Sequence, residues 1–161
     1  MSKKILGIAL SLTLLGSIAG AVWASTTTNS PGAYCVASTG SLSVRDDGEV
    51  ENTTGSTVTA VCPAERAIAP STVTQVSGTV FVVDRSSTAN VCCRVVSRNA
   101  SGSVVLGTEE CSTGSSTSYQ QLALPQITDT ATFSQYFVRC TVPPVSAGAA
   151  SRIQLYRTTQ D

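Results

Sequence analysis

The chain has 161 residues, with ten lysines and arginines against ten acidic residues and no histidine. Charged residues make up 12% of it and aromatic residues 5%. Such a composition lacks the basic surface that neutralises several phosphates, so we expect no nucleic-acid partner. The absence of histidine also removes the side chain that most often activates a serine or cysteine nucleophile.

The N-terminus has the pattern of a secretory signal peptide. Two lysines precede an apolar run over residues 5–18, and small residues follow up to Ala24. The run is shorter than the roughly 20 residues that span a bilayer. We therefore expect a cleaved signal over residues 1–24, with a cut after Ala21 or a retained anchor as alternatives. The mature chain would then be secreted, extracellular or periplasmic, with no membrane span. Both lysines leave with the signal, so eight arginines face ten acids, a formal charge of −2.

The residues that follow the signal predict a leader and then an all-β domain. Residues 25–32 (STTTNSPG) are polar, contain proline and lack apolar periodicity, so we expect a flexible leader. From residue 33 to 161, short runs of Val, Thr, Phe and Tyr alternate with Gly, Pro, Asp, Asn and Ser, which indicates one domain of short strands. The strands are expected over residues 33–37, 41–45, 49–52, 58–62, 73–84, 91–98, 103–110, 118–124, 132–142 and 152–157.

Turn residues lie between several of these runs. Asp46-Asp47-Gly48 and Asn99-Ala100-Ser101-Gly102 predict hairpins, because glycine supplies a positive φ at no steric cost. A turn of helix could fit between Ala64 and Pro70. The predicted fold class is all-β: an antiparallel two-sheet sandwich, jelly-roll or Ig-like, stabilised by disulfides, rather than a barrel.

The phase of the strands predicts which way each cysteine points. Side chains alternate between the two faces of a strand. Cys93 shares a face with Val91 and Val95 and should point inward, whereas Cys92 should point outward. By the same argument Cys62 and Cys140 belong to the interior.

The same phases restrict the disulfide pairing. Neighbouring cysteines on one strand diverge, so a bond between Cys92 and Cys93 would need a distorted backbone. Cys111 lies across the predicted hairpin turn from Cys92, which favours that pair. The remaining four cysteines allow more than one arrangement, of which we favour Cys35 with Cys62 and Cys93 with Cys140.

Parts of the chain resemble a group of small secreted bacterial proteins of unassigned function. The resemblance lies in Cys62-Pro63, in Val80–Asp84 followed by Val91-Cys92-Cys93, in the run YFVRCTVPP over residues 136–144, and in SRIQLYR over residues 151–157. Such proteins look like disulfide-stabilised sandwich domains, and the resemblance implies no activity, ligand or functional residue. Cys92 and Cys111 are a departure from the pattern, which also favours pairing these two.

Little in the sequence indicates catalysis or a metal. No catalytic residue and no cofactor is predicted, although a pair of carboxylates acting as a glycoside hydrolase is a further alternative. Zinc is not expected, because no two cysteines have the spacing of a structural site. Asp46, Asp47 and Glu49 are a weak calcium candidate, since calcium prefers carboxylate oxygens, but a plain hairpin turn explains them equally well.

One strand carries a candidate contact patch. Phe133, Phe137 and Arg139 share the face opposite Cys140, so they should be exposed if that cysteine is buried. Tyr119 or Tyr156 could lie nearby, and the alternative is a central strand with both faces covered. We therefore predict a non-catalytic secreted protein that acts by contact, either a surface or assembly component or a binding module. The partner would be a protein, a glycan or another copy of the chain, and a carbohydrate- or cell-envelope-binding module is the main alternative.

Overall fold

The computed structural model describes residues 25–65, 75–131 and 133–161. The predicted signal peptide, most of the possible helical turn after Ala64 and the first residues of two predicted strands lie outside these ranges. Within them no helix is long and apolar enough to cross a membrane. The described elements are β1 (Thr26–Pro31), the 3₁₀ turn η1 (Gly32–Tyr34), β2 (Val36–Thr39), β3 (Ser43–Val44), β4 (Val50–Glu51), β5 (Val58–Pro63), β6 (Gln75–Val83), β7 (Cys92–Arg98), β8 (Val104–Leu106), β9 (Glu110–Cys111), β10 (Gln120–Thr128), β11 (Gln135–Val142) and β12 (Arg152–Gln160).

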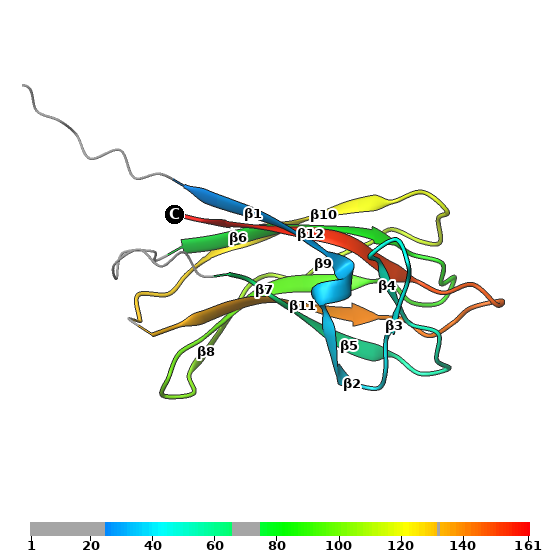
Figure 1. Ribbon diagram of the computed structural model, residues 1–161, viewed down its shortest axis with the longest axis horizontal. Coiled ribbons are helices and arrows are strands. Elements are labelled where there is room, and N and C mark those ends of the chain that lie inside the picture. The colour runs from blue at the N-terminus through cyan, green and yellow to red at the C-terminus, as the bar shows by residue number, and fades with distance from the viewer. Residues whose placement is uncertain (1–24, 66–74, 132) are drawn as a thin grey trace, which may run out of the picture.

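The strands form two antiparallel sheets that pack face to face (Figure 1). The first sheet has the order β10-β6-β12-β4-β3, with β1 also paired to β12. The second has the order β2-β5-β11-β7-β8, with β9 also paired to β7. The expected all-β sandwich is confirmed. Each layer mixes strands that are far apart in the sequence, so the sheets depend on long-range pairing.

Alternating side chains fill the space between the sheets. In β5 and β11 every second residue is buried, and the residues between them are partly or fully exposed. Ala60, Val138 and Val142 are fully buried, and from the first sheet Ile153 and Tyr156 meet them in the core. Burial of this kind contributes roughly 25 cal/mol for each Å² of apolar surface removed from water.

The expectation of a flexible leader is wrong for residues 26–31. They form β1, which lies antiparallel along β12 with Thr26 opposite Gln160 and Pro31 opposite Leu155. The strand is polar because it lies at a sheet edge and is held by backbone pairing, with added hydrogen bonds such as Arg157 Nε to Asn29 Oδ1 at 2.8 Å. An edge strand needs no apolar alternation, so the pattern that marks the other strands is missing here.

The residues after β1 also differ from the prediction. A strand was expected from residue 33, but Gly32–Tyr34 form the 3₁₀ turn η1 instead. This turn packs against β12 so closely that a Cβ atom on Gly32 would lie 2.1 Å from the carbonyl oxygen of Ile153. The chain can therefore pass from the first sheet to the second only with glycine at this position.

Both predicted hairpin turns are present. Gly48 has a φ of 83° and its amide donates to the carbonyl of Arg45, which closes the β3–β4 hairpin. Gly102 has a φ of 88° and donates to the carbonyl of Asn99 in the β7–β8 hairpin. Asn99 Oδ1 also accepts from the amide of Ser103 at 2.9 Å, so this side chain holds the turn from within.

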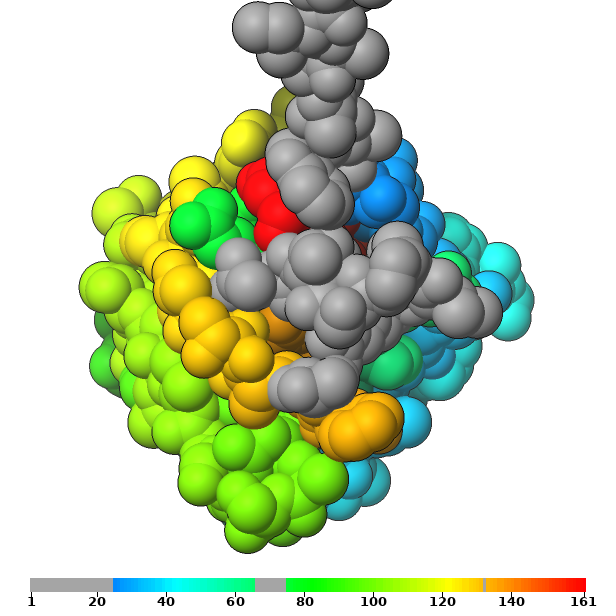
Figure 2. Space-filling view, turned by 90° about the vertical axis from the view of Figure 1, so that its left-hand side faces the viewer, coloured from blue at the N-terminus to red at the C-terminus, as the bar shows by residue number. Residues whose placement is uncertain are grey.

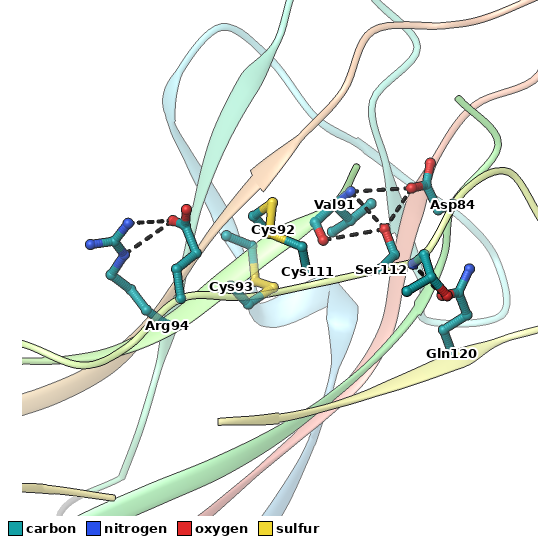
Figure 3. Close-up of a disulfide and its surroundings, with 11 residues drawn as sticks. Asp84, Val91, Cys92, Cys93, Arg94, Cys111, Ser112 and Gln120 are labelled. Atoms are coloured by element: carbon teal, nitrogen blue, oxygen red, sulfur yellow. Dashed lines mark hydrogen bonds and ion pairs between the residues drawn. A yellow bond between two sulfur atoms is a disulfide. The ribbon is translucent and has the colours of Figure 1, made fainter. Parts of the chain in front are cut away.

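Three disulfides link the strands: Cys35–Cys62, Cys92–Cys111 and Cys93–Cys140. These are the pairs favoured above. Cys35, Cys62, Cys93 and Cys140 are buried in the core, whereas Cys92 is partly exposed and Cys111 is exposed. The first and third bonds therefore lie inside the sandwich, and Cys92–Cys111 ties β7 to β9 on the outer surface of the second sheet (Figure 3).

A buried aspartate connects the two sheets at one end. Asp84 follows β6 and its exposed fraction is 0%. Its carboxylate accepts hydrogen bonds from Ser86 N at 2.9 Å, Ser151 Oγ at 3.1 Å, Val91 N at 3.3 Å and Ser112 Oγ at 2.5 Å. Figure 3 shows Ser112 and Val91 converging on it, next to the Cys92–Cys111 bond. Because Ser151 precedes β12 and Val91 precedes β7, one side chain fixes strand ends from both layers.

Candidate functional site

The outer surface of the second sheet presents a regular array of side chains. In antiparallel sheets, residues directly opposite each other point to the same face. The outward residues of the three central strands form what we call the β11 face: Val61 and Pro63 from β5; Gln135, Phe137 and Arg139 from β11; and Arg94, Val96 and Arg98 from β7.

An apolar row crosses this β11 face. Phe137 lies opposite Pro63 on one side and opposite Val96 on the other, and Val96 lies opposite Leu106 of β8. Although Val96 points away from the core, its exposed fraction is 1%. The side chains of this row therefore pack closely. Phe137 lies on the middle strand of the sheet, and its ring is held between Pro63 and Val96.

Two adjoining hollows border the row at one end of the sandwich. The larger, of about 520 Å³, is lined by Val61, Pro63, Ala64, Arg98, Gln135, Tyr136 and Phe137. The smaller, of about 340 Å³, is lined by Arg98, Asn99, Ala100, Phe133 and Gln135. The two share Arg98 and Gln135, which lie opposite each other on β7 and β11. Figure 2 views this end of the molecule, with the β7–β8 hairpin as the lower lobe and the start of β11, in orange, beside it.

The hollows bring together the predicted aromatic residues. Phe133 is 77% exposed, the most exposed large apolar side chain among the described residues, and Phe137 is half-buried. Arg139 is half-buried one position further along the same face of β11. Of the three residues predicted from strand phase, Phe137 and Arg139 lie on this face of β11, whereas Phe133 lies just before the strand. The prediction did not include Arg98 and Gln135, which the β7–β11 register places opposite each other.

The arginines of the β11 face differ in their partners. Arg94 pairs with Glu109 through Nε at 3.1 Å and through a second, shorter contact of its terminal nitrogen. Arg98 and Arg139 make no side-chain hydrogen bond or ion pair with any residue in the described ranges. As far as the described residues go, two guanidinium groups on this face can thus donate to a ligand, each with up to five N–H groups.

The two tyrosines considered as neighbours of this patch lie elsewhere. Tyr119 packs against Phe81 of β6 on the first sheet, with ring centroids 5.9 Å apart. Tyr156 is buried in the core and its hydroxyl donates to the carbonyl of Pro63 at 2.6 Å. Burial raises the pKa of the Tyr156 hydroxyl above 10. Neither tyrosine contributes to the hollows of the β11 face.

The calcium candidate at the β3–β4 hairpin is held by arginine in the structure. Arg45 contacts Asp47 at 3.3 Å, Glu49 at 3.6 Å and Glu51 at 3.1 Å. Glu49 also pairs with Arg152 Nε at 2.8 Å and accepts from Gln154. A hydrogen bond from the amide of Glu49, assisted by Arg45, lowers the pKa of Asp47 below its usual value. Asp46 is exposed to solvent. Asp47 accepts from Arg45 and from the amide of Glu49, and Glu49 Oε2 lies within ion-pair distance of Arg45 and Arg152, so the cluster forms an ion-pair network.

Other acidic residues have structural partners too. Asp129 is buried and accepts from the hydroxyls of Ser97 and Ser134. Glu109 lies beside Cys92 and Cys111, but both sulfur atoms are held in a disulfide and are not free to ligate a metal. Asp84, with its four donors, and Asp129 are therefore held by structural partners inside the fold.

Comparison with known proteins shows what fold this is. No family model and no curated protein matches the chain. A solved structure of a xylan-binding module, CBM15, is 11% identical over 85% of this chain and 97% of its own, with a TM-score of 0.53. The CBM22-1–GH10 modules of xylanase 10B from Clostridium thermocellum, in complex with xylohexaose, match at 8% identity over 82% of this chain, also with a TM-score of 0.53. A family two carbohydrate esterase from Cellvibrio japonicus matches at 12% identity over 86% of this chain, with a TM-score of 0.45.

Two of these matches cover only part of the known structure. This chain spans 35% of the esterase and 27% of the xylanase structure, but nearly the whole of the xylan-binding module. At these identities the likeness is one of fold. The chain therefore has the two-sheet sandwich fold that carbohydrate-binding modules also have.

Proposed function

We propose that the protein is an exported, non-catalytic carbohydrate-binding module, and that its ligand site is the β11 face. The observation that supports this most directly is the pair of hollows between Phe133 and Phe137, bridged by Arg98 and Gln135. Ligand sites commonly combine an apolar or aromatic lining with a few polar groups that fix orientation. The fold shared with a xylan-binding module supports a polysaccharide such as xylan as the ligand.

Each residue has a defined role in this proposal. The flat rings of Phe133 and Phe137 would pack against the C–H faces of successive sugar units, which buries apolar area without requiring sequence-specific contacts. Arg98 and Gln135 would donate to sugar hydroxyls across the junction of the two hollows. Because Phe137 is packed between Pro63 and Val96, its ring is already ordered, and binding then costs little side-chain entropy.

Export is part of the proposal. The expected signal over residues 1–24 and three disulfides in a chain with no free cysteine among its described residues both suit an oxidising compartment. A polysaccharide ligand would be met outside the cytoplasm as well. Recovery of the protein from periplasm or culture medium with Ser25 as the first residue would support export and cleavage of the signal.

Affinity electrophoresis in gels that contain soluble xylan tests the binding site. We expect retarded migration of the exported protein and its loss in a variant with Phe133→Ala and Phe137→Ala. Tyr119→Ala is the matched control, because Tyr119 is 63% exposed on the opposite sheet. Equal retardation of the double variant, or loss of retardation in Tyr119→Ala alone, would contradict the assignment to the β11 face.

A second candidate function is self-association along the sheet edges. The short edge strand β8 exposes Val104 and Leu106, and the opposite edge strand β2 exposes Val36. Unpaired edges with apolar side chains favour pairing with another chain. Size-exclusion chromatography over a range of concentrations tests this candidate, and a monomer at all concentrations would remove it.

A further inference from the structure

The charge of the β11 face points to a more specific ligand. The β11 face carries three arginines, and Glu109 beside it pairs with Arg94, which leaves a local charge of +2 in a chain that carries −2 after residue 24. We propose that the module binds an acidic polysaccharide, one that carries uronic acid carboxylates, through Arg98 and Arg139. This inference rests on the proposed function and specifies the class of glycan.

The contrast with the arginines of the β3–β4 hairpin supports this assignment. At the β3–β4 hairpin of the first sheet, Arg45 and Arg152 are neutralised by Glu49, Glu51 and Asp47. Among the arginines of the β11 face, Arg94 alone has an acidic partner in the part of the chain that the structure describes. Within the described ranges, the guanidinium groups of Arg98 and Arg139 pair with none of the acids. An anionic ligand would supply the acceptor groups that these two guanidinium groups can bind.

The positions of the two arginines suit a chain with repeated carboxylates. Arg98 lies in the row of Gln135, and Arg139 lies two rows away, with the row of Phe137 between them. Adjacent rows are about 7 Å apart, because two strand residues rise by that distance. A polysaccharide that packs a sugar on Phe137 would thus have one guanidinium group on either side. Guanidinium groups bind carboxylates through two parallel hydrogen bonds, which gives both strength and selectivity.

The same surface does not suit other anionic partners as well. Two free cations are too few for a nucleic acid, whose affinity depends on neutralising many phosphates. An acidic protein would need neither the ordered ring of Phe137 nor the adjoining hollows. The combination of a fixed ring with flanking guanidinium groups therefore favours an acidic glycan over an acidic protein.

The test compares one polymer in two chemical states. Isothermal titration of the exported protein uses xylan that carries glucuronic acid and the same xylan after its carboxyl groups have been reduced to alcohols. We expect about tenfold tighter binding to the acidic polymer, the sum of two partly exposed charge contacts. Added salt should weaken binding to the acidic polymer and leave the reduced one unchanged.

Two variants complete the test. Arg98→Gln together with Arg139→Gln should remove the tenfold preference and retain binding to the reduced polymer, whereas Arg157→Gln on the first sheet is the matched control. Equal affinity for both polymers overturns the acidic-glycan inference and leaves the proposed function intact. No binding to either polymer overturns the proposed function itself. Competition by polyglutamate at the same concentration as the acidic xylan would also overturn the inference, in favour of an acidic protein.

Discussion

Replacement of Asp84 by alanine should be the most destabilising single change at a polar residue of this protein. The carboxylate accepts four hydrogen bonds within a fully buried site. In the variant, Val91 N keeps Ser112 Oγ as an acceptor at 2.9 Å, and Ser112 Oγ keeps the carbonyl of Val91. The amide of Ser86 and the hydroxyl of Ser151 lose their acceptor. An unsatisfied buried donor costs roughly 1 to 3 kcal/mol, so we expect a loss of about 4 kcal/mol in the free energy of unfolding.

Urea denaturation followed by circular dichroism measures this loss, provided that the slope with urea stays unchanged. Asp84→Asn keeps the shape but turns an NH₂ group toward two of the donors, so we expect a smaller loss of about 2 kcal/mol. Asp46→Ala in the exposed hairpin is the control and should change stability by less than about 0.5 kcal/mol. A loss below about 1 kcal/mol for Asp84→Ala would refute the reasoning, since water would then have to satisfy both donors.

Three further predictions concern other features of the fold. Gly32→Ala should cost about 3 kcal/mol because its Cβ would meet the Ile153 carbonyl, whereas Gly55→Ala, with open space around it, should be neutral; equal melting temperatures would contradict this. The buried Tyr156 hydroxyl has a raised pKa, so it stabilises the fold below pH 10 and loses this contribution as the pH rises through the folded value. Alkaline titration of stability should therefore show a decline that Tyr156→Phe removes, and a decline of the same size in that variant would exclude Tyr156 as its source. Removal of Cys92–Cys111 by two alanines should cost about 3 kcal/mol, less than removal of the buried Cys93–Cys140 bond, which closes a longer loop; the reverse order in urea would contradict this.

The cysteine phases show how much of the fold was readable from the sequence. Alternation along β7 was enough to place Cys93 inside and Cys92 outside, and the hairpin at Asn99–Gly102 brought Cys111 opposite Cys92. These are local features, set by strand geometry and by a glycine turn. The assignment of Cys93–Cys140 needed the pairing of β7 with β11, which the sequence favoured but could not establish.

Features that depend on long-range partners could not be predicted in this way. The strand β1 is polar, and only its pairing with β12 at the other end of the chain orders it. The acids near Gly48 have one guanidinium partner close in the sequence, Arg45, and a second, Arg152, that only the pairing of β4 with β12 brings to them. In the candidate site, the outward position of Phe137 followed from phase within one strand, whereas Phe133 lies before β11 and Arg98 is placed by the register between two strands.

The position of the Cys92–Cys111 bond makes one part of the protein chemically addressable. The other two bonds are enclosed between the sheets, but this one lies at the surface, on the same side of the sheet as Arg94 and Phe137. A gentle thiol reagent would therefore open it first, while the interior stays oxidised. The released sulfhydryls could carry a fluorophore that reports occupancy of the neighbouring surface, so the molecule has a built-in attachment point for its own ligand assay.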